Sequence, residues 1–153
     1  MKKRSKNPAE VMRKKCVELA KQIVRRQQNY TCEYSGQKEP QIRTHGSHVY
    51  SEGVYRSMSA DLDNILCLAA VHHLAHSYWN KANKWSWHGT PLEAIEWFKE
   101  KYPARYKTLK QRARKSVQAD EMFWTKKLAE LKKIWDLLLI KENSKIEEEF
   151  DYG

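Results

Sequence analysis

The sequence predicts an α+β domain, mostly helical, in which a small core containing strands lies between helical flanks. Residues 8–28 and the segments beyond residue 90 repeat apolar side chains every three or four positions, as helices do. Residues 30–55 lack that spacing and contain strand-like and turn-like runs. With 153 residues, of which 41% are hydrophobic, the chain suits one domain with a modest core.

The first helix is predicted to run from Pro8 to about Gln28. Asn7 and Pro8 provide a cap and a first-turn residue, and one face carries Cys16, Leu19, Ala20 and Ile23. Short strands are then expected at 30–34, 41–45 and 48–50, with a turn at Ser35-Gly36. Residues 58–64 are expected to form a loop.

Residues 65–80 are apolar and contain neither Gly nor Pro, so they predict a helix, followed by a loop over 81–89. Thr90-Pro91 begins another helix that extends to about Lys101. One or two further helices follow Pro103, and they carry an apolar stripe of Trp124, Leu128, Leu131, Trp135 and Leu138. Packing of this stripe on its own domain is favoured, while a homodimer or a protein partner bound through the C-terminal helix stays open.

Charge divides the chain into a basic N-terminal helix (1–29), a core (30–102) and a C-terminal helical extension with an acidic tail (103–153). The net charge is +10, and the positive charge is concentrated in two segments. Residues 1–28 contain ten Lys or Arg and two Glu, and residues 101–133 contain eleven Lys or Arg and three Asp or Glu. Such an excess favours a polyanionic partner, most often nucleic acid. Expected phosphate contacts include Arg25, Arg26, Arg43, Lys81 and Lys84.

Several classes of protein are disfavoured. No apolar run approaches the roughly 18 residues that span a bilayer, and the start MKKRSKNPAE lacks the apolar stretch of a signal peptide. Three scattered cysteines do not make a disulfide framework, which indicates a reducing compartment. We therefore expect a cytoplasmic protein without a membrane partner.

Five of the six histidines fall between positions 45 and 76, namely His45, His48, His72, His73 and His76. They include strand-like positions and predicted helix positions, with Asn64 in the loop between. A strand histidine can deprotonate water, a loop asparagine can hold the geometry or bind metal through its amide oxygen, and a neutral helix histidine can ligate a divalent cation. These are the parts of a small metal-dependent phosphodiesterase site.

Residues 30–97 resemble the HNH (His-Me finger, ββα-metal) endonucleases, especially the small phage-type NinG-like recombination nucleases. Residues 32–36 (CEYSG) resemble the first knuckle of that family, and 46–51 (GSHVYS) match the segment with the first motif histidine. Residues 56–64 (RSMSADLDN) are similar to the loop that ends in the motif asparagine, nine residues before His73. Residues 90–98 (TPLEAIEWF) look like the trailing helix of the family.

The resemblance implies a ββα-metal core and a role for each matching residue. His48 would be the general base, Asn64 would orient it, and His73 would bind one divalent ion, Mg²⁺ or Mn²⁺ ahead of Zn²⁺. His76 and His45 are the candidates to complete the ligand set, and Arg56 is expected to clamp a phosphate. The implied substrate is DNA, with branched or recombination DNA as one option, in a bacterial host cell if a phage encodes the chain.

The sequence departs from the family at two places. Of the knuckle ligands, Cys32 and His72 remain, while Ser35 and Ala69 replace cysteines, so no structural zinc is expected. Ser47 stands where many relatives have an acidic metal ligand. A second hypothesis is therefore a non-catalytic nucleic-acid-binding protein derived from this fold, or a subunit of a nucleoprotein complex. Ordinary packing or polar roles are favoured for His72, His88, Trp79, Trp85 and Trp87.

Overall fold

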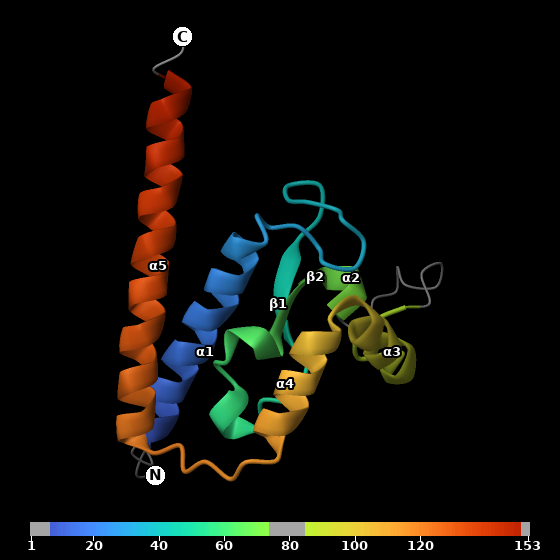
Figure 1. Ribbon diagram of the computed structural model, residues 1–153, viewed down its shortest axis with the longest axis vertical. Coiled ribbons are helices and arrows are strands. Elements are labelled where there is room, and N and C mark those ends of the chain that lie inside the picture. The colour runs from blue at the N-terminus through green and yellow to red at the C-terminus, as the bar shows by residue number, and fades with distance from the viewer. Residues whose placement is uncertain (1–6, 74–84, 151–153) are drawn as a thin grey trace, which may run out of the picture.

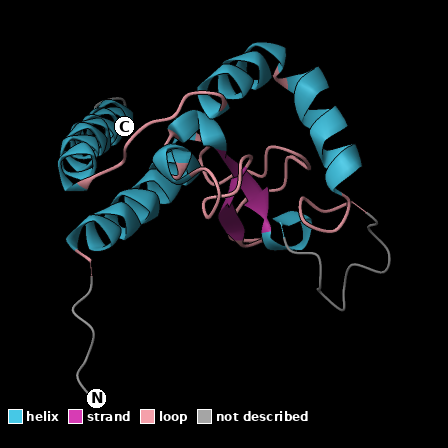
Figure 2. Ribbon diagram, turned by 90° about the horizontal axis from the view of Figure 1, so that it is seen from below, coloured by secondary structure: helices cyan, strands magenta, loops and turns pink. Residues whose placement is uncertain are grey.

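The computed structural model describes residues 7–73 and 85–150 (Figure 1). It has an α+β fold, mostly helical, with a small two-stranded antiparallel sheet, as the sequence predicts (Figure 2). Within the described ranges, no helix is both long enough and apolar enough to cross a bilayer. The elements are α1 (Pro8–Gln27), β1 (Thr44–His48), β2 (Ile65–Ala69), α2 (Ala70–His73), α3 (Pro91–Lys101), α4 (Pro103–Ala113) and α5 (Glu121–Phe150), with 3₁₀ turns at Arg56–Met58 and Leu62–Asn64.

Helix α1 begins where predicted and buries the predicted face. The side chain of Asn7 accepts a hydrogen bond from the Ala9 backbone N–H at 3.0 Å, and Pro8 occupies the first turn. The fully buried side chains of its apolar face are Cys16, Ala20 and Ile23. Capping and apolar spacing were therefore sufficient to predict this helix.

The helix predicted over residues 65–80 is wrong for its first five residues. Ile65–Ala69 is the strand β2, buried along its whole length, and α2 begins only at Ala70. Its first and third side chains enter a core with α1 and α5, whereas its second and fourth enter a core with α3 and α4. Because both faces are covered, the strand is apolar throughout and lacks the alternation that identifies a half-exposed strand. Residues 74–80 of the predicted helix lie outside the described residues.

Residues 30–50 contain less strand than predicted. Thr31 and Lys38 form an isolated bridge, and β1 is one strand over Thr44–His48 in place of separate segments at 41–45 and 48–50. Its limits follow from pairing, because each of its five residues lies opposite one residue of β2. The predicted loop over 58–64 includes the second 3₁₀ turn and the end of the first.

The apolar stripe of α5 packs against α1 of the same chain, the alternative that the sequence favoured. The two helices lie side by side in Figure 1, and Trp124 and Leu131 are buried in their shared core. Arg26 of α1 pairs with Glu142 of α5, and its guanidinium carbon lies 4.8 Å from the centre of the Trp135 ring. A homodimer or a partner bound through this helix stays a prediction.

Gly46 lets α1 lie directly on β1. A Cβ atom at this position would come within 2.6 Å of Cγ, 2.7 Å of Cβ and 3.1 Å of Cα of Lys21. We expect Gly46→Ala to lower the free energy of unfolding by about 1–3 kcal/mol, measured by urea denaturation, because the backbone of α1 has to move. Gly53→Ala is the matched control, since its Cβ would meet no atom closer than 3.9 Å. Equal effects of the two substitutions would contradict the close approach.

Candidate functional site

The order β1, β2, α2 brings His45 and His73 together. Thr44 pairs with Ala69, the residue before α2, so the first turn of this helix lies beside the start of β1. The Nδ1 atoms of His45 and His73 are 3.1 Å apart, and the two rings are nearly perpendicular, at 89°. Two predicted site residues, 28 positions apart in the chain, are therefore direct neighbours.

His88 joins this cluster, although the sequence indicated an ordinary polar residue. The centres of its ring and of the His73 ring are 5.0 Å apart. His88 also lines a pocket of about 220 Å³ together with His48. The signal that could have drawn attention to it is its place just before the Thr90-Pro91 start of α3, because loop residues at helix N-termini often contact ligands.

The ring of His48 is held by a backbone carbonyl. Its Nε2 atom lies 2.7 Å from the carbonyl oxygen of Ser59, and a carbonyl only accepts, so Nε2–H donates and Nδ1 keeps its lone pair. Nδ1 is 3.7 Å from a carboxylate oxygen of Glu52, too far for a hydrogen bond. Burial lowers the pKa of His48 from its ordinary 6.5. The side chain is thus a neutral imidazole with Nδ1 suited to accept a proton.

Asn64 holds the loop that follows His48 in place through side-chain hydrogen bonds. It is fully buried, and its Oδ1 accepts a hydrogen bond from the Tyr50 backbone N–H at 2.7 Å. Its Nδ2 donates to the carbonyl oxygens of Tyr50 and Met58, both at 3.0 Å. The amide therefore serves the 49–58 segment, which favours the orienting role over the alternative of a metal ligand.

His45 and His73 have the chemistry of metal ligands. Burial, followed by the neighbouring His88 and His45, lowers the pKa of His73 to about 4, and burial, followed by Arg43, lowers that of His45. Neutral imidazole is the form that binds a cation. Their nitrogen separation of 3.1 Å is near the ~3.3 Å between two nitrogens bound at about 2.0–2.1 Å to a tetrahedral ion. The two Nδ1 atoms are also at hydrogen-bond distance, so a divalent ion that took both nitrogens as ligands would replace the proton shared between them.

The rest of a ligand set is not apparent in the described ranges. There, no group of three or more His, Cys, Asp or Glu side chains has metal-binding geometry, and His76 lies outside them. Ser47 follows His45 on the same face of β1, because side chains alternate along a strand. Its hydroxyl is fully buried and has no hydrogen-bond partner in the part of the chain that the structure describes. This hydroxyl occupies the position at which the family resemblance implies an acidic ligand.

Three of the basic residues expected to contact DNA form ion pairs within the chain. Arg25 pairs with Glu39, Arg26 with Glu142 and Arg56 with Glu10. Arg25 also donates to the Thr44 hydroxyl at 3.1 Å, so it holds the start of β1. These side chains therefore have structural partners, and Lys81 and Lys84 lie outside the described residues.

Lys21 and Arg43 bring positive charge to the histidine cluster. Arg43 is exposed and precedes β1, and Lys21 lies over Gly46 in the middle of that strand. Burial lowers the pKa of His45, and the charges of Arg43 and Lys21 lower it further. Sequence reasoning missed Lys21, although its place one turn before Arg25 puts both on the same face of α1.

The segments that resemble a degenerate zinc knuckle contain an aromatic cluster. The rings of Tyr34 and Trp85 stack with centres 3.7 Å apart and planes within 1°, and His72 meets the Tyr34 ring edge-on at 5.0 Å. Cys32 is buried beside them, but Ala69 offers no ligand atom. A four-ligand zinc site does not fit these residues, and aromatic packing holds Tyr34, His72 and Trp85 together. The absence of a structural zinc stays a prediction.

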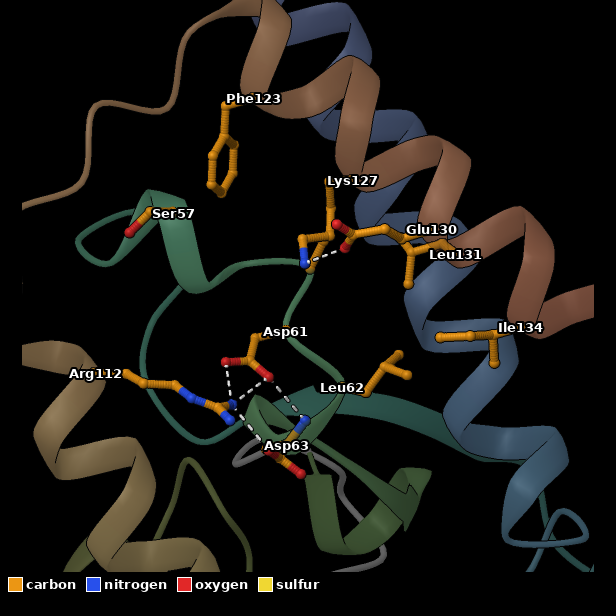
Figure 3. Close-up of a pocket in the computed structure, with 11 residues that line it drawn as sticks. Ser57, Asp61, Leu62, Asp63, Arg112, Phe123, Lys127, Glu130, Leu131 and Ile134 are labelled. Atoms are coloured by element: carbon orange, nitrogen blue, oxygen red, sulfur yellow. Dashed lines mark hydrogen bonds and ion pairs between the residues drawn. The ribbon is translucent and has the colours of Figure 1, made fainter.

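A larger hollow, of about 460 Å³, lies away from the histidines between α4, α5 and residues 57–63 (Figure 3). Its charges are paired with one another: Arg112 binds Asp61 and Asp63, and Lys127 binds Glu130. No histidine or cysteine is among the described residues that line it. The paired charges give this hollow a structural role between the helices, so the histidine cluster is the better candidate site.

Comparisons of the chain with family models, with curated proteins and with solved structures find no match. The site is therefore interpreted from its residues and geometry.

Proposed function

We propose that the protein is a metal-dependent DNA endonuclease of the HNH type, which hydrolyses phosphodiester bonds with His48 as general base. One divalent cation, Mg²⁺ or Mn²⁺ ahead of Zn²⁺, would be held at His73 and His45. The observation that carries the proposal is the meeting of histidines from β1, α2 and the 85–90 loop at one site. Asn64 fixes the loop next to them.

The geometry supports a separate task for each residue. His48 would take the proton of the attacking water at Nδ1, while its Nε2–H donates to the Ser59 carbonyl and keeps the ring in place. Asn64 would keep the 49–58 loop closed on the end of β1. A cation bound by His45 and His73 would supply charge stabilisation at the phosphate.

The charge distribution supports DNA as the substrate. Lys21 and Arg43 lie at the histidine cluster, and Lys14 and Lys15 of α1 are exposed. Contacts of Lys and Arg with phosphates release counterions, so binding should weaken steeply as the salt concentration rises. The same contacts carry no base readout, which favours recognition of DNA by shape, including branched forms.

Cleavage of plasmid and branched DNA tests the proposal directly. We expect nicking or cutting with Mg²⁺ or Mn²⁺ and none with excess chelator. His73→Ala should raise the metal concentration needed for half-maximal cleavage by at least tenfold, since loss of even an outer-shell partner costs about 10–100-fold in metal affinity. Thermal melting checks that the variant is folded. Lack of cleavage by the unaltered protein with every metal would contradict the proposed activity.

The pH dependence of cleavage gives an independent check on the base. Burial lowers the pKa of His48 from 6.5, so its neutral form predominates at and above pH 6.5. We expect the cleavage rate at saturating metal to vary little above pH 6.5, apart from hydroxide effects on the metal. Below that pH it should fall as His48 becomes protonated. A rate that instead keeps rising tenfold per pH unit through neutrality would rule out a base with this pKa.

A non-catalytic nucleic-acid-binding protein is the second candidate. The neutral, buried Ser47 at the position of an acidic ligand favours it. Its signature would be salt-sensitive binding of DNA, measured by fluorescence anisotropy, together with no cleavage and no effect of His73→Ala on binding.

A further inference from the structure

The pocket that His48 shares with His88 lies between the end of β1 and the start of α3. It has a volume of about 220 Å³, and its lining residues are His48, Val49, Ser51, Trp87, His88, Pro91 and Ile95. One wall thus comes from the end of β1 and the residues after it. The other comes from the loop that carries His88 and from the first turns of α3.

His88 is held in this pocket by a well-anchored loop. The preceding residue, Trp87, is 6% exposed, and its backbone N–H donates to the carbonyl of His72 at 2.7 Å. On the other side, the Ser86 backbone N–H donates to the Thr90 hydroxyl at 3.1 Å, and the Gly89 backbone N–H donates to the Ser86 hydroxyl at 2.9 Å. The exposed imidazole of His88 is therefore carried by a backbone that is hydrogen-bonded both before and after it.

We propose that this pocket is the subsite for the scissile phosphodiester group and that a ring N–H of His88 donates a hydrogen bond to one of its non-bridging oxygens. The inference rests on the proposed nuclease function and adds to it a substrate-binding residue. An imidazole always carries at least one N–H, so the contact needs no change of protonation.

The surroundings of the pocket suit an anion. His48 and His88 face the same space, and the His73 ring lies 5.0 Å from that of His88, so a phosphate there would lie beside the proposed base and the proposed metal ligand. Lys21 adds positive charge near His48. A carboxylate, that of Glu52, also lies nearby, 3.7 Å from His48 Nδ1, on the side where the attacking water would lie.

A short phosphodiester tests this subsite without relying on cleavage. Thymidylyl-thymidine, which has one phosphodiester, is titrated into the full chain in chelator while the histidine side-chain NMR signals are recorded. We expect the His88 and His48 signals to shift on binding. His88→Ala should weaken binding about tenfold or more, the size expected for one hydrogen bond to a charged group. His88→Gln, which restores an N–H donor, should bind within threefold of the unaltered protein.

Leu92→Ala is the matched control, because Leu92 is 78% exposed in the first turn of α3 and does not line the pocket. The proposal is overturned if the dinucleotide shifts neither histidine or if His88→Ala binds as well as the control. It is also overturned if His88→Gln is as weak as His88→Ala, or if His88→Ala raises the metal requirement of cleavage as a lost metal ligand would. Binding with the expected pattern but without DNA cleavage would support the subsite and contradict the nuclease function alone.

Discussion

His48→Ala should slow DNA cleavage by about 10²–10⁴-fold at saturating metal, the range that a positioned general base contributes. The physical reason is that Nε2 of His48 is committed to the Ser59 carbonyl, which leaves Nδ1 as the nitrogen that can take the proton from water. The measurement is the single-turnover rate of plasmid nicking. The metal concentration for half-maximal cleavage should stay within about threefold, because the proposed ligands His45 and His73 are untouched.

Added imidazole separates loss of the base from loss of structure. The deleted ring, whose side chain is 10% exposed, leaves room beside an open pocket, and free imidazole at high concentration should restore part of the rate at neutral pH. Val54→Ala is the control, because Val54 is 75% exposed in the loop after His48. It does not line the pocket of His48 and His88 and belongs to neither apolar core. Cleavage by His48→Ala within threefold of the unaltered rate would remove His48 from the mechanism.

Asn64→Ala should lower the free energy of unfolding by about 2–5 kcal/mol. The substitution leaves the Tyr50 N–H and the carbonyls of Tyr50 and Met58 without their partner in a fully buried site, and each such loss costs about 1–3 kcal/mol. The loop that follows His48 would also lose the hydrogen bonds that hold it in place, so the rate of cleavage should fall in the same variant. Urea denaturation at neutral pH measures the stability.

Two further variants sharpen this result. Asn64→Asp keeps an acceptor for the Tyr50 N–H but directs carboxylate oxygens at two carbonyls, so it should be destabilised strongly as well. Asn143→Ala replaces an exposed asparagine of α5 and should change stability by less than about 0.5 kcal/mol. A loss below 1 kcal/mol for Asn64→Ala would mean that Asn64 does not hold the loop.

Local chemistry in the sequence was sufficient for several features. The cap at Asn7-Pro8, the apolar face of α1 and the Thr90-Pro91 start of α3 depend on neighbours within a few positions, and all three are confirmed. The grouping of histidines and Asn64 between positions 45 and 73 also indicated the region of the site. His45 and His73 prove to be neighbours, while the roles of the site residues stay predictions.

Long-range contacts decided what the sequence could not. Strand β2 looked helical because its two faces are covered by different cores, one formed with α1 and α5 and the other with α3 and α4. Glu33 shows the same dependence: its carboxylate binds the Cys67 backbone N–H and the Tyr102 hydroxyl, residues 34 and 69 positions away. No local pattern reports such partners, because they are set by how the elements pack.

The sequence by itself determined the helical flanks, the excess of positive charge and the set of imidazoles available for chemistry, since each follows from composition or from spacing within one element. Only the tertiary structure decided which of these groups meet. It ties Arg25, Arg26 and Arg56 to carboxylates and brings Lys21 to the site. It also adds His88 to the cluster, 15 positions after His73 in the chain, because α3 and the loop before it pack against one face of the small sheet.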